Sequence, residues 1–315
     1  MSRQQKRLEE RKASKLLKTI QKMNSLLYPH QSEPMEDIMN SDRGKIIYPT
    51  GTGKTYMQAA TISLDILHNP IDVKCSLDTS RVYIIQVPRI LLSYQILNEN
   101  YKFFNKFGIP AKYLVVHSGT AVDDGKLLKS KNFNMPWVPI DVTTDKEVIK
   151  ENIIKAQQMG AGARPLVIVQ TYHSADKTFD VLDEMNIVAR IVQNDECQYL
   201  VSKEFSHLLK VPCEKMFSYT ATQKNAHHIG MENEELWGKT IAKMSPREAV
   251  EKGLIVRPRN IVQCSKNPIS EEDARKSFSR FIKSDWEALK KVNHKAKNKM
   301  LVKTRGTDDM KIFIE

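Results

Sequence analysis

Short apolar runs alternate with longer amphipathic stretches through most of the chain. The runs have the length of buried strands, and sequence of helical length lies between most of them. The six predicted strands are residues 45–49, 81–88, 111–118, 165–171, 189–195 and 215–222. Strands that alternate with helices are typical of a parallel sheet covered by helices on both faces, so the pattern predicts an α/β fold.

Three segments lie outside this alternation, and two of them, 265–298 and 3–27, have a helical pattern. Residues 265–298 begin with a capping-box spacing and continue with apolar residues at helical spacing, which predicts a helical connector. Residues 119–142 lie between two predicted strands and are expected to form a surface insertion. Residues 3–27 carry apolar residues at spacings compatible with one helical face, namely Leu8, Leu16, Leu17, Ile20, Met23 and Leu27.

The composition excludes several classes of protein. With 41% hydrophobic and 27% charged residues, the 315-residue chain resembles an ordinary soluble protein. No apolar stretch approaches the roughly 20 residues that span a bilayer. The four cysteines include no CxxC pair, which argues against a zinc site or a disulfide framework. We therefore expect no membrane partner and a cytoplasmic location. A viral protein that acts in the host cytoplasm would fit this expectation as well.

The formal net charge of +12 is concentrated in two flanking segments. Residues 1–24 contain eight Lys and Arg against two Glu, and residues 266–305 contain twelve against five Asp and Glu. The segment between them is nearly neutral. Such basic segments favour an anionic partner such as a nucleic acid, although a solvated, frayed terminal helix would have the same composition.

The stretch YPTGTGKT (48–55) has the sequence of a phosphate-binding loop. It lies between a predicted strand and a helical stretch, where backbone N–H groups and a helix N-terminus attract phosphate. In such loops the lysine, here Lys54, reaches the β- and γ-phosphates, and the hydroxyl of Thr55 faces Mg²⁺. Tyr48 replaces the first glycine of the strict pattern. The residues expected to bind ATP are Thr50, Gly51, Thr52, Gly53, Lys54 and Thr55.

A second acidic site is needed to hold the metal ion and activate water. Asp195 and Glu196 follow the predicted strand 189–195 and provide it. We expect Asp195 to hold Mg²⁺ and Glu196 to act as general base. An Asp-Glu pair alone is commonly a solvated loop, so the argument depends on its coexistence with the phosphate loop.

Six short motifs occur in an order that resembles helicase superfamily two, particularly restriction-enzyme motor subunits and phage or repair helicases. They are YPHQ (28–31), PTGTGKT (49–55), VPRILLSYQ (87–95), QTYHSA (170–175), DECQ (195–198) and YTAT (219–222). The resemblance covers residues 28–262. It implies a RecA-like lobe whose ATP hydrolysis drives movement on nucleic acid, with DNA favoured over RNA.

The resemblance also implies roles for individual residues. Gln31 would read adenine, while Gln198, Thr220 and Thr222 would couple the ATP site to the nucleic-acid groove. Gln198 departs from the His or Asp that is common at its position, so it can form hydrogen bonds but carries no charge. The residues expected to contact the phosphodiester backbone are Arg89, Gln95, Ser118, Gly119, Thr171, Tyr172 and His173. Tyr172 could instead be a core residue and His173 an ordinary loop residue.

The same resemblance predicts the domain organisation. We expect a basic helical extension at 1–27, the ATP-binding lobe at 28–264, a helical connector at 265–298 and the first strand of a second lobe at 299–315. In this family a second lobe supplies an arginine finger, which contributes roughly 10³–10⁵ to the hydrolysis rate in related enzymes. The chain alone is therefore expected to hydrolyse ATP weakly until a missing lobe or a partner chain completes it.

Two other functions remain open at this point. A non-motor module could use its nucleotide state to dock a partner or a nucleic acid. A small-molecule kinase would share the phosphate loop, but it would not need the motifs at the other strand ends.

Overall fold

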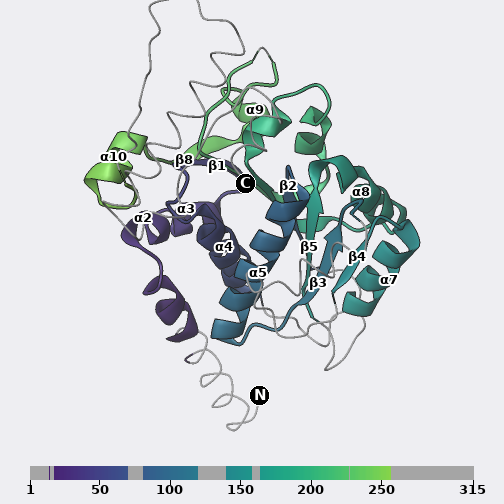
Figure 1. Ribbon diagram of the computed structural model, residues 1–315. Coiled ribbons are helices and arrows are strands. Elements are labelled where there is room, and N and C mark those ends of the chain that lie inside the picture. The colour runs from purple at the N-terminus through teal and green to yellow at the C-terminus, as the bar shows by residue number, and fades with distance from the viewer. Residues whose placement is uncertain are drawn as a thin grey trace, which may run out of the picture. The chain divides into compact units, whose positions relative to one another are not determined.

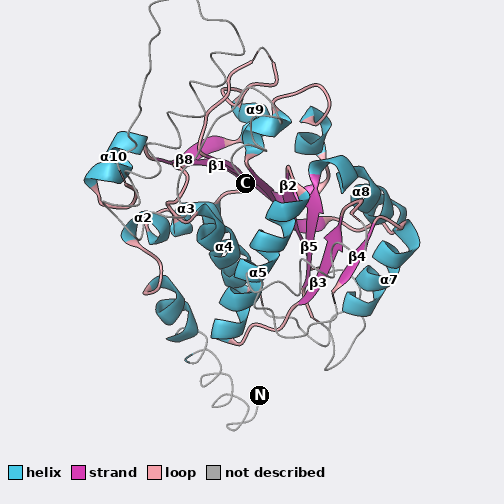
Figure 2. Cartoon of the chain, in the orientation of Figure 1, coloured by secondary structure: helices cyan, strands magenta, loops and turns pink. Residues whose placement is uncertain are grey.

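The computed structural model describes residues 14, 18–69, 81–119, 140–157, 164–226 and 228–256. Within these residues eight strands form one sheet, and every neighbouring pair is parallel. The strands are β1 (Arg43–Ile47), β2 (Val82–Val87), β3 (Lys112–Val116), β4 (Asp141–Thr143), β5 (Leu166–Thr171), β6 (Ala189–Asp195), β7 (Cys213–Thr220) and β8 (Lys239–Lys243). Their order across the sheet is β4-β3-β5-β2-β6-β7-β1-β8. The predicted α/β fold with a parallel sheet is confirmed (Figures 1 and 2).

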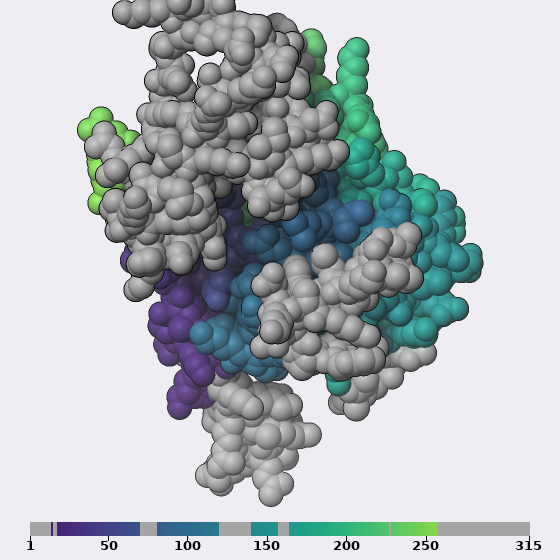
Figure 3. Space-filling model, viewed as in Figure 1, coloured from purple at the N-terminus to yellow at the C-terminus, as the bar shows by residue number. Residues whose placement is uncertain are grey.

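Helices cover both faces of the sheet (Figure 1). One face packs against α3 (Met35–Asn40), α4 (Lys54–His68), α5 (Ile90–Phe107) and α10 (Pro246–Glu251), while α2 (Pro29–Ser32) bonds to the loop after β1. The other packs against α7 (Lys146–Gln157), α8 (Ala175–Glu184), α9 (Glu234–Trp237) and the short 3₁₀ helices η1 (Tyr172–Ser174), η2 (Cys197–Leu200) and η3 (Ser206–Lys210). In the space-filling view, the teal surface of the α7 and α8 region lies beside the blue surface of the α5 region (Figure 3).

Burial on both faces explains the apolar runs of the central strands. Every residue of β2 and of β5 is buried. A strand in such a position needs apolar side chains in both directions, so its sequence is a continuous apolar run and not an alternating one. The structure contains all six predicted strands, with bounds that differ by a few residues.

Two strands were not predicted, and both lie at the edges of the sheet. β4 pairs only with β3 among the described strands, and β8 pairs only with β1. β4 begins at Asp141, inside the segment expected to be a surface insertion, so that prediction was wrong for its last residues. Neither edge strand contains a buried residue, which removes the apolar signal on which the prediction depended.

The described part of the N-terminal extension packs against the lobe. Met23 and Leu27 are buried in the same core cluster as α4 and α5. The predicted connector at 265–298 and the predicted strand at 299–315 lie outside the described residues. No helix in the described part of the chain is long and apolar enough to cross a membrane.

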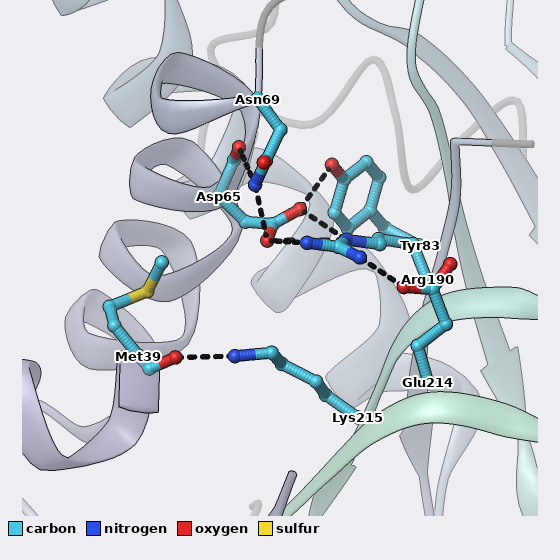
Figure 4. A network of polar contacts seen from close by, with 7 residues as sticks. All are labelled: Met39, Asp65, Asn69, Tyr83, Arg190, Glu214 and Lys215. Atoms are coloured by element: carbon cyan, nitrogen blue, oxygen red, sulfur yellow. Dashed lines mark hydrogen bonds and ion pairs between the residues drawn. The ribbon is translucent and has the colours of Figure 1, made fainter. Parts of the chain in front are cut away.

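An ion pair between the partly buried Arg190 and the buried Asp65 joins the C-terminal end of α4 to the start of the central strands (Figure 4). The Arg190 guanidinium donates to both carboxylate oxygens of Asp65, at 2.9 and 3.0 Å, and the Tyr83 hydroxyl donates to the same carboxylate at 2.8 Å. Arg190 also pairs with Glu214 at the edge of this group. These contacts anchor α4 at the end opposite to the phosphate loop, so the helix that begins at the loop has a fixed position.

Candidate functional site

The predicted site residues follow the carboxyl ends of parallel strands. Because all the strands run in one direction, the loops after β1, β2, β3, β5, β6 and β7 lie along the same edge of the sheet. Most of the predicted site residues lie in these loops or at the last residue of the preceding strand, whereas Lys54 and Thr55 begin α4, Gln31 lies on α2 and Gln95 lies on α5. Parallel topology therefore brings together the strand-end motifs, from the phosphate loop at 48–55 to YTAT at 219–222.

The phosphate loop has the backbone geometry that its glycines permit. Gly51 has φ of 89° and Gly53 has φ of 83°, a left-handed conformation that other residues rarely adopt. Gly53 precedes the first residue of α4, so the N-terminus of that helix faces the loop. This arrangement presents backbone N–H groups and the positive end of the helix dipole to a phosphate.

Two side chains from outside the loop support its backbone. The Gln31 amide donates to the carbonyl oxygens of Thr52 at 3.0 Å and Gly53 at 3.3 Å, while its oxygen accepts from the backbone of Tyr28 at 3.0 Å. The His30 ring bonds to the Thr52 carbonyl at 2.9 Å. Both polar groups of the Gln31 side chain therefore form hydrogen bonds with the backbone in this structure, and its role in reading adenine remains a prediction.

Lys54 is buried beside the two acidic residues. Its ammonium donates to the carbonyl oxygen of Tyr48 at 3.0 Å. Burial lowers the pKa of Lys54, and the nearby charges of Glu196 and Asp195 oppose that shift. An ammonium held within the field of two carboxylates is placed to bridge them and the terminal phosphates of a nucleotide.

Asp195 ends β6 and is almost completely buried. Its carboxylate accepts a hydrogen bond from Gln58 Nε2 at 2.8 Å. Burial, followed by the adjacent charge of Glu196, raises the pKa of Asp195 to about 6. Gln58 Oε1 is buried and has no hydrogen-bond partner among the described residues. Hard oxygen ligands beside an unsatisfied amide oxygen suit a hydrated Mg²⁺, which typically uses one or two carboxylates and keeps several waters.

A chain of hydrogen bonds leads from Glu196 to the loop after β7. Gln198 Nε2 donates to the Glu196 carboxylate at 3.0 Å, and the Thr220 hydroxyl donates to Gln198 Oε1. Thr222 N donates to the Thr220 hydroxyl at 3.0 Å. The neutral amide of Gln198 therefore links the Glu196 carboxylate to the loop after β7 through hydrogen bonds alone.

The residues predicted to contact nucleic acid divide into two groups. Arg89, Gln95, Ser118 and His173 are exposed at or near this edge of the sheet, and Gly119 is partly exposed. Thr171 and Tyr172 are buried, at 5% and 2% exposure. A direct contact with a phosphodiester is not available to either of them in this structure. The open alternative for Tyr172, a core residue, matches its position.

Sequence reasoning missed two residues that support the site. Gln58 lies four residues after Lys54 on α4 and so shares its helix face, and this polar residue within an apolar stretch was a usable signal. His117 accepts from the Gly119 backbone at 2.9 Å and bonds to the Tyr94 hydroxyl at 3.0 Å, which fixes the loop after β3. No local pattern distinguished His117 from an ordinary buried histidine.

Comparisons with known proteins agree with this geometry. The family described as type III restriction enzyme, res subunit, matches residues 7–225, which include all six motifs. No curated protein sequence matches the chain.

Two solved structures have a similar fold. One is a nuclease-deletion mutant of the type ISP restriction-modification enzyme LlaGI in complex with a DNA substrate mimic, with a TM-score of 0.54 and 19% identity over 82% of this chain. The other is the ATP-dependent type ISP restriction-modification enzyme LlaBIII bound to DNA, with a TM-score of 0.54 and 19% identity over 72% of this chain. The match covers 22% of the LlaGI chain and 15% of the LlaBIII chain, so this protein spans less than a quarter of either one.

Proposed function

Because the chain belongs to the family of type III restriction enzyme res subunits, we propose that it is the ATP-binding lobe of an ATP-dependent DNA helicase or translocase. The lobe would comprise residues 28–264 and would couple ATP hydrolysis to movement on nucleic acid together with a second lobe. Members of this family use a nucleotide, and several residues of this chain are suited to bind one.

One observation carries the proposal. The hydrogen bonds from Glu196 through Gln198 to Thr220 join the proposed catalytic carboxylate to a neighbouring strand-end loop. A nucleotide-binding module without a motor function would need the phosphate loop but no such connection. The connection supports a site in which events at ATP alter the loops that face nucleic acid.

The chain supplies a residue for each role in hydrolysis. Lys54 would bind the β- and γ-phosphates, and the loop N–H groups from Thr50 to Gly53 would hold the remaining oxygens. Thr55 and Asp195 would hold Mg²⁺, which neutralises charge on the phosphates when it is bound. Glu196 would accept the proton of the attacking water, since a carboxylate next to the metal ligand is placed for that task.

The nucleic-acid partner is proposed to be DNA. Both similar solved structures contain DNA or a DNA mimic, and the exposed strand-end residues suit contacts with a phosphodiester backbone. The residues proposed to make these contacts are Arg89, Gln95, Ser118, Gly119 and His173. A second lobe, in the same protein or in a partner chain, would supply the arginine finger.

The test measures nucleotide binding and turnover by the 315-residue chain. A fluorescent ATP analogue should bind the unsubstituted protein and Glu196→Gln with similar affinity, and Lys54→Ala at least tenfold more weakly. Lys45→Ala is the matched control, because Lys45 is also buried but its ammonium bonds to the Gly238 carbonyl. Equal binding by Lys54→Ala and the unsubstituted chain would refute an ATP site at this loop.

Turnover is then compared without nucleic acid and with single-stranded DNA, duplex DNA and RNA. We expect low turnover that rises when a second lobe is added, and that DNA stimulates more than RNA. Strong stimulated turnover by this chain alone would show that it, or a second copy of it, supplies the arginine. Stimulation by RNA only would refute DNA as the partner.

A further inference from the structure

Tyr172 makes a contact that the proposed mechanism does not use. Its hydroxyl donates to the backbone carbonyl oxygen of Asp195 at 2.6 Å. Tyr172 follows β5, whereas Asp195 ends β6, and β2 lies between these strands. The tyrosine side chain therefore passes the carboxyl end of β2 to reach the peptide that joins the two acidic residues.

The residue that follows this peptide bond has an unusual backbone conformation. Glu196 has φ of 49° and ψ of 48°, the left-handed region that residues other than glycine rarely adopt. Such strain persists only where neighbouring groups hold the backbone in place. Two hydrogen bonds hold this region, because the Asp195 carbonyl accepts from Tyr172 and the Glu196 carboxylate accepts from the Gln198 amide.

We propose that Tyr172 is a positioning residue, whose hydroxyl holds the Asp195–Glu196 peptide so that Glu196 keeps its left-handed conformation and its carboxylate faces the nucleotide. The role of the carboxylate rests on the proposed function, whereas the hold on the peptide does not. Without the hydroxyl, the peptide would rotate to release the strain at Glu196, and the buried Asp195 carbonyl would lack a partner.

Tyr172 connects the hydrogen bond to the Asp195 carbonyl with an exposed residue on the protein surface. Tyr172 begins the η1 turn, and the next residue, His173, is exposed and pairs with Glu204 at 3.4 Å. The His173 ring also packs edge-on against Phe205, with ring centroids 4.8 Å apart. A nucleic-acid backbone that engages His173 would therefore act on a turn that is directly bonded to the catalytic peptide.

The burial of the tyrosine allows a clean substitution. Its ring is completely enclosed and packs 5.8 Å from the Phe205 ring, so Tyr172→Phe removes the hydroxyl and keeps the packing. Tyr83→Phe is the matched control. Tyr83 is also fully buried, its hydroxyl donates to Asp65 at 2.8 Å, and it lies at the opposite end of the sheet.

Hydrogen–deuterium exchange of the 315-residue chain tests the proposal without nucleotide. Tyr172→Phe should raise the exchange rate of peptides covering residues 195–199 about tenfold, because the strained backbone at Glu196 is then no longer held and opens more readily. Tyr83→Phe should leave those peptides within twofold of the unsubstituted chain. An unchanged rate in Tyr172→Phe, or an equal increase in Tyr83→Phe, would overturn the proposal.

A second background separates positioning from general loosening. Glycine adopts the left-handed conformation without strain. In Glu196→Gly the peptide has no strain to release, so adding Tyr172→Phe should change exchange less than twofold. A full tenfold effect in that background would show that the hydroxyl does not act through Glu196.

The two proposals fail in different measurements. Loss of the exchange effect would leave ATP binding through Lys54 untouched. Equal ATP binding by Lys54→Ala would refute the nucleotide site and leave the contact between Tyr172 and the peptide as it is.

Discussion

Two buried aspartates should respond in opposite ways to replacement by asparagine. Asp195 lies beside another carboxylate and accepts one hydrogen bond from the Gln58 amide. Asp65 faces a guanidinium, which donates to both of its carboxylate oxygens. The substitution is the same and both side chains are buried, so the sign of the stability change reports the electrostatic environment alone.

The magnitude for Asp195 follows from its pKa. The pKa rises from 3.8 to about 6 on folding, chiefly because of burial. A shift of this size corresponds to about 3 kcal/mol of lost stability at pH 7.5. The carboxyl is protonated in both states at low pH, so the cost is absent well below pH 4, increases through pH 4–6 and is complete above that range.

Asp195→Asn should therefore stabilise the nucleotide-free protein. Asparagine is neutral, and its side-chain oxygen can still accept from Gln58. The free energy of unfolding should rise by up to about 3 kcal/mol at pH 7.5 and by only about 1 kcal/mol at pH 4.5. Asp65→Asn should lower it by about 2–4 kcal/mol at pH 7.5, because the partly buried Arg190 loses a charged, bidentate partner.

Urea denaturation followed by circular dichroism at the two pH values measures all of these differences. Destabilisation by Asp195→Asn at pH 7.5 would refute the argument. A stabilisation that is the same at both pH values would also refute it, because the gain would then come from packing and not from the removed charge.

Two further predictions concern the nucleotide site. Gly53→Ala should weaken ATP-analogue binding at least tenfold, because the new Cβ would lie 2.2 Å from Gln31 Nε2 and φ is 83°. Gly108→Ala is the control: its φ is 65° and no atom lies within 4 Å of the new Cβ, so it should cost only about 1 kcal/mol of stability and leave binding unchanged. Equal effects of the two substitutions on binding would contradict this prediction. The Mg²⁺ affinity of the nucleotide complex should fall about tenfold from pH 7 to pH 5, beyond the change for free nucleotide. Protonation of Asp195, whose pKa is raised to about 6, would remove a proposed ligand. A titration that follows free nucleotide at both pH values would contradict this prediction.

Patterns within short windows of sequence were sufficient for the fold class and for the backbone geometry of the phosphate loop. The apolar run of β2 and the phosphate loop before α4 are both visible over a few residues, because burial and tight turns restrict composition locally. The family match supports the resemblance to helicase superfamily two that the six motifs carried.

Weakly buried elements escaped prediction for the same reason. β4 and β8 contain no buried residue, so their sequences carry no apolar run. They are strands because a neighbouring strand offers hydrogen bonds at the sheet edge. That information lies in the partner and not in the segment itself.

The role of Tyr172 shows what only the tertiary structure decided. The motif around it indicated a surface contact, and the sequence determined that Tyr172 follows one strand and Asp195 ends another. That the tyrosine hydroxyl reaches the Asp195 carbonyl depends on the order β5-β2-β6 across the sheet. Strand order is set by the packing of all the helices and strands together, and no short segment of the sequence encodes it.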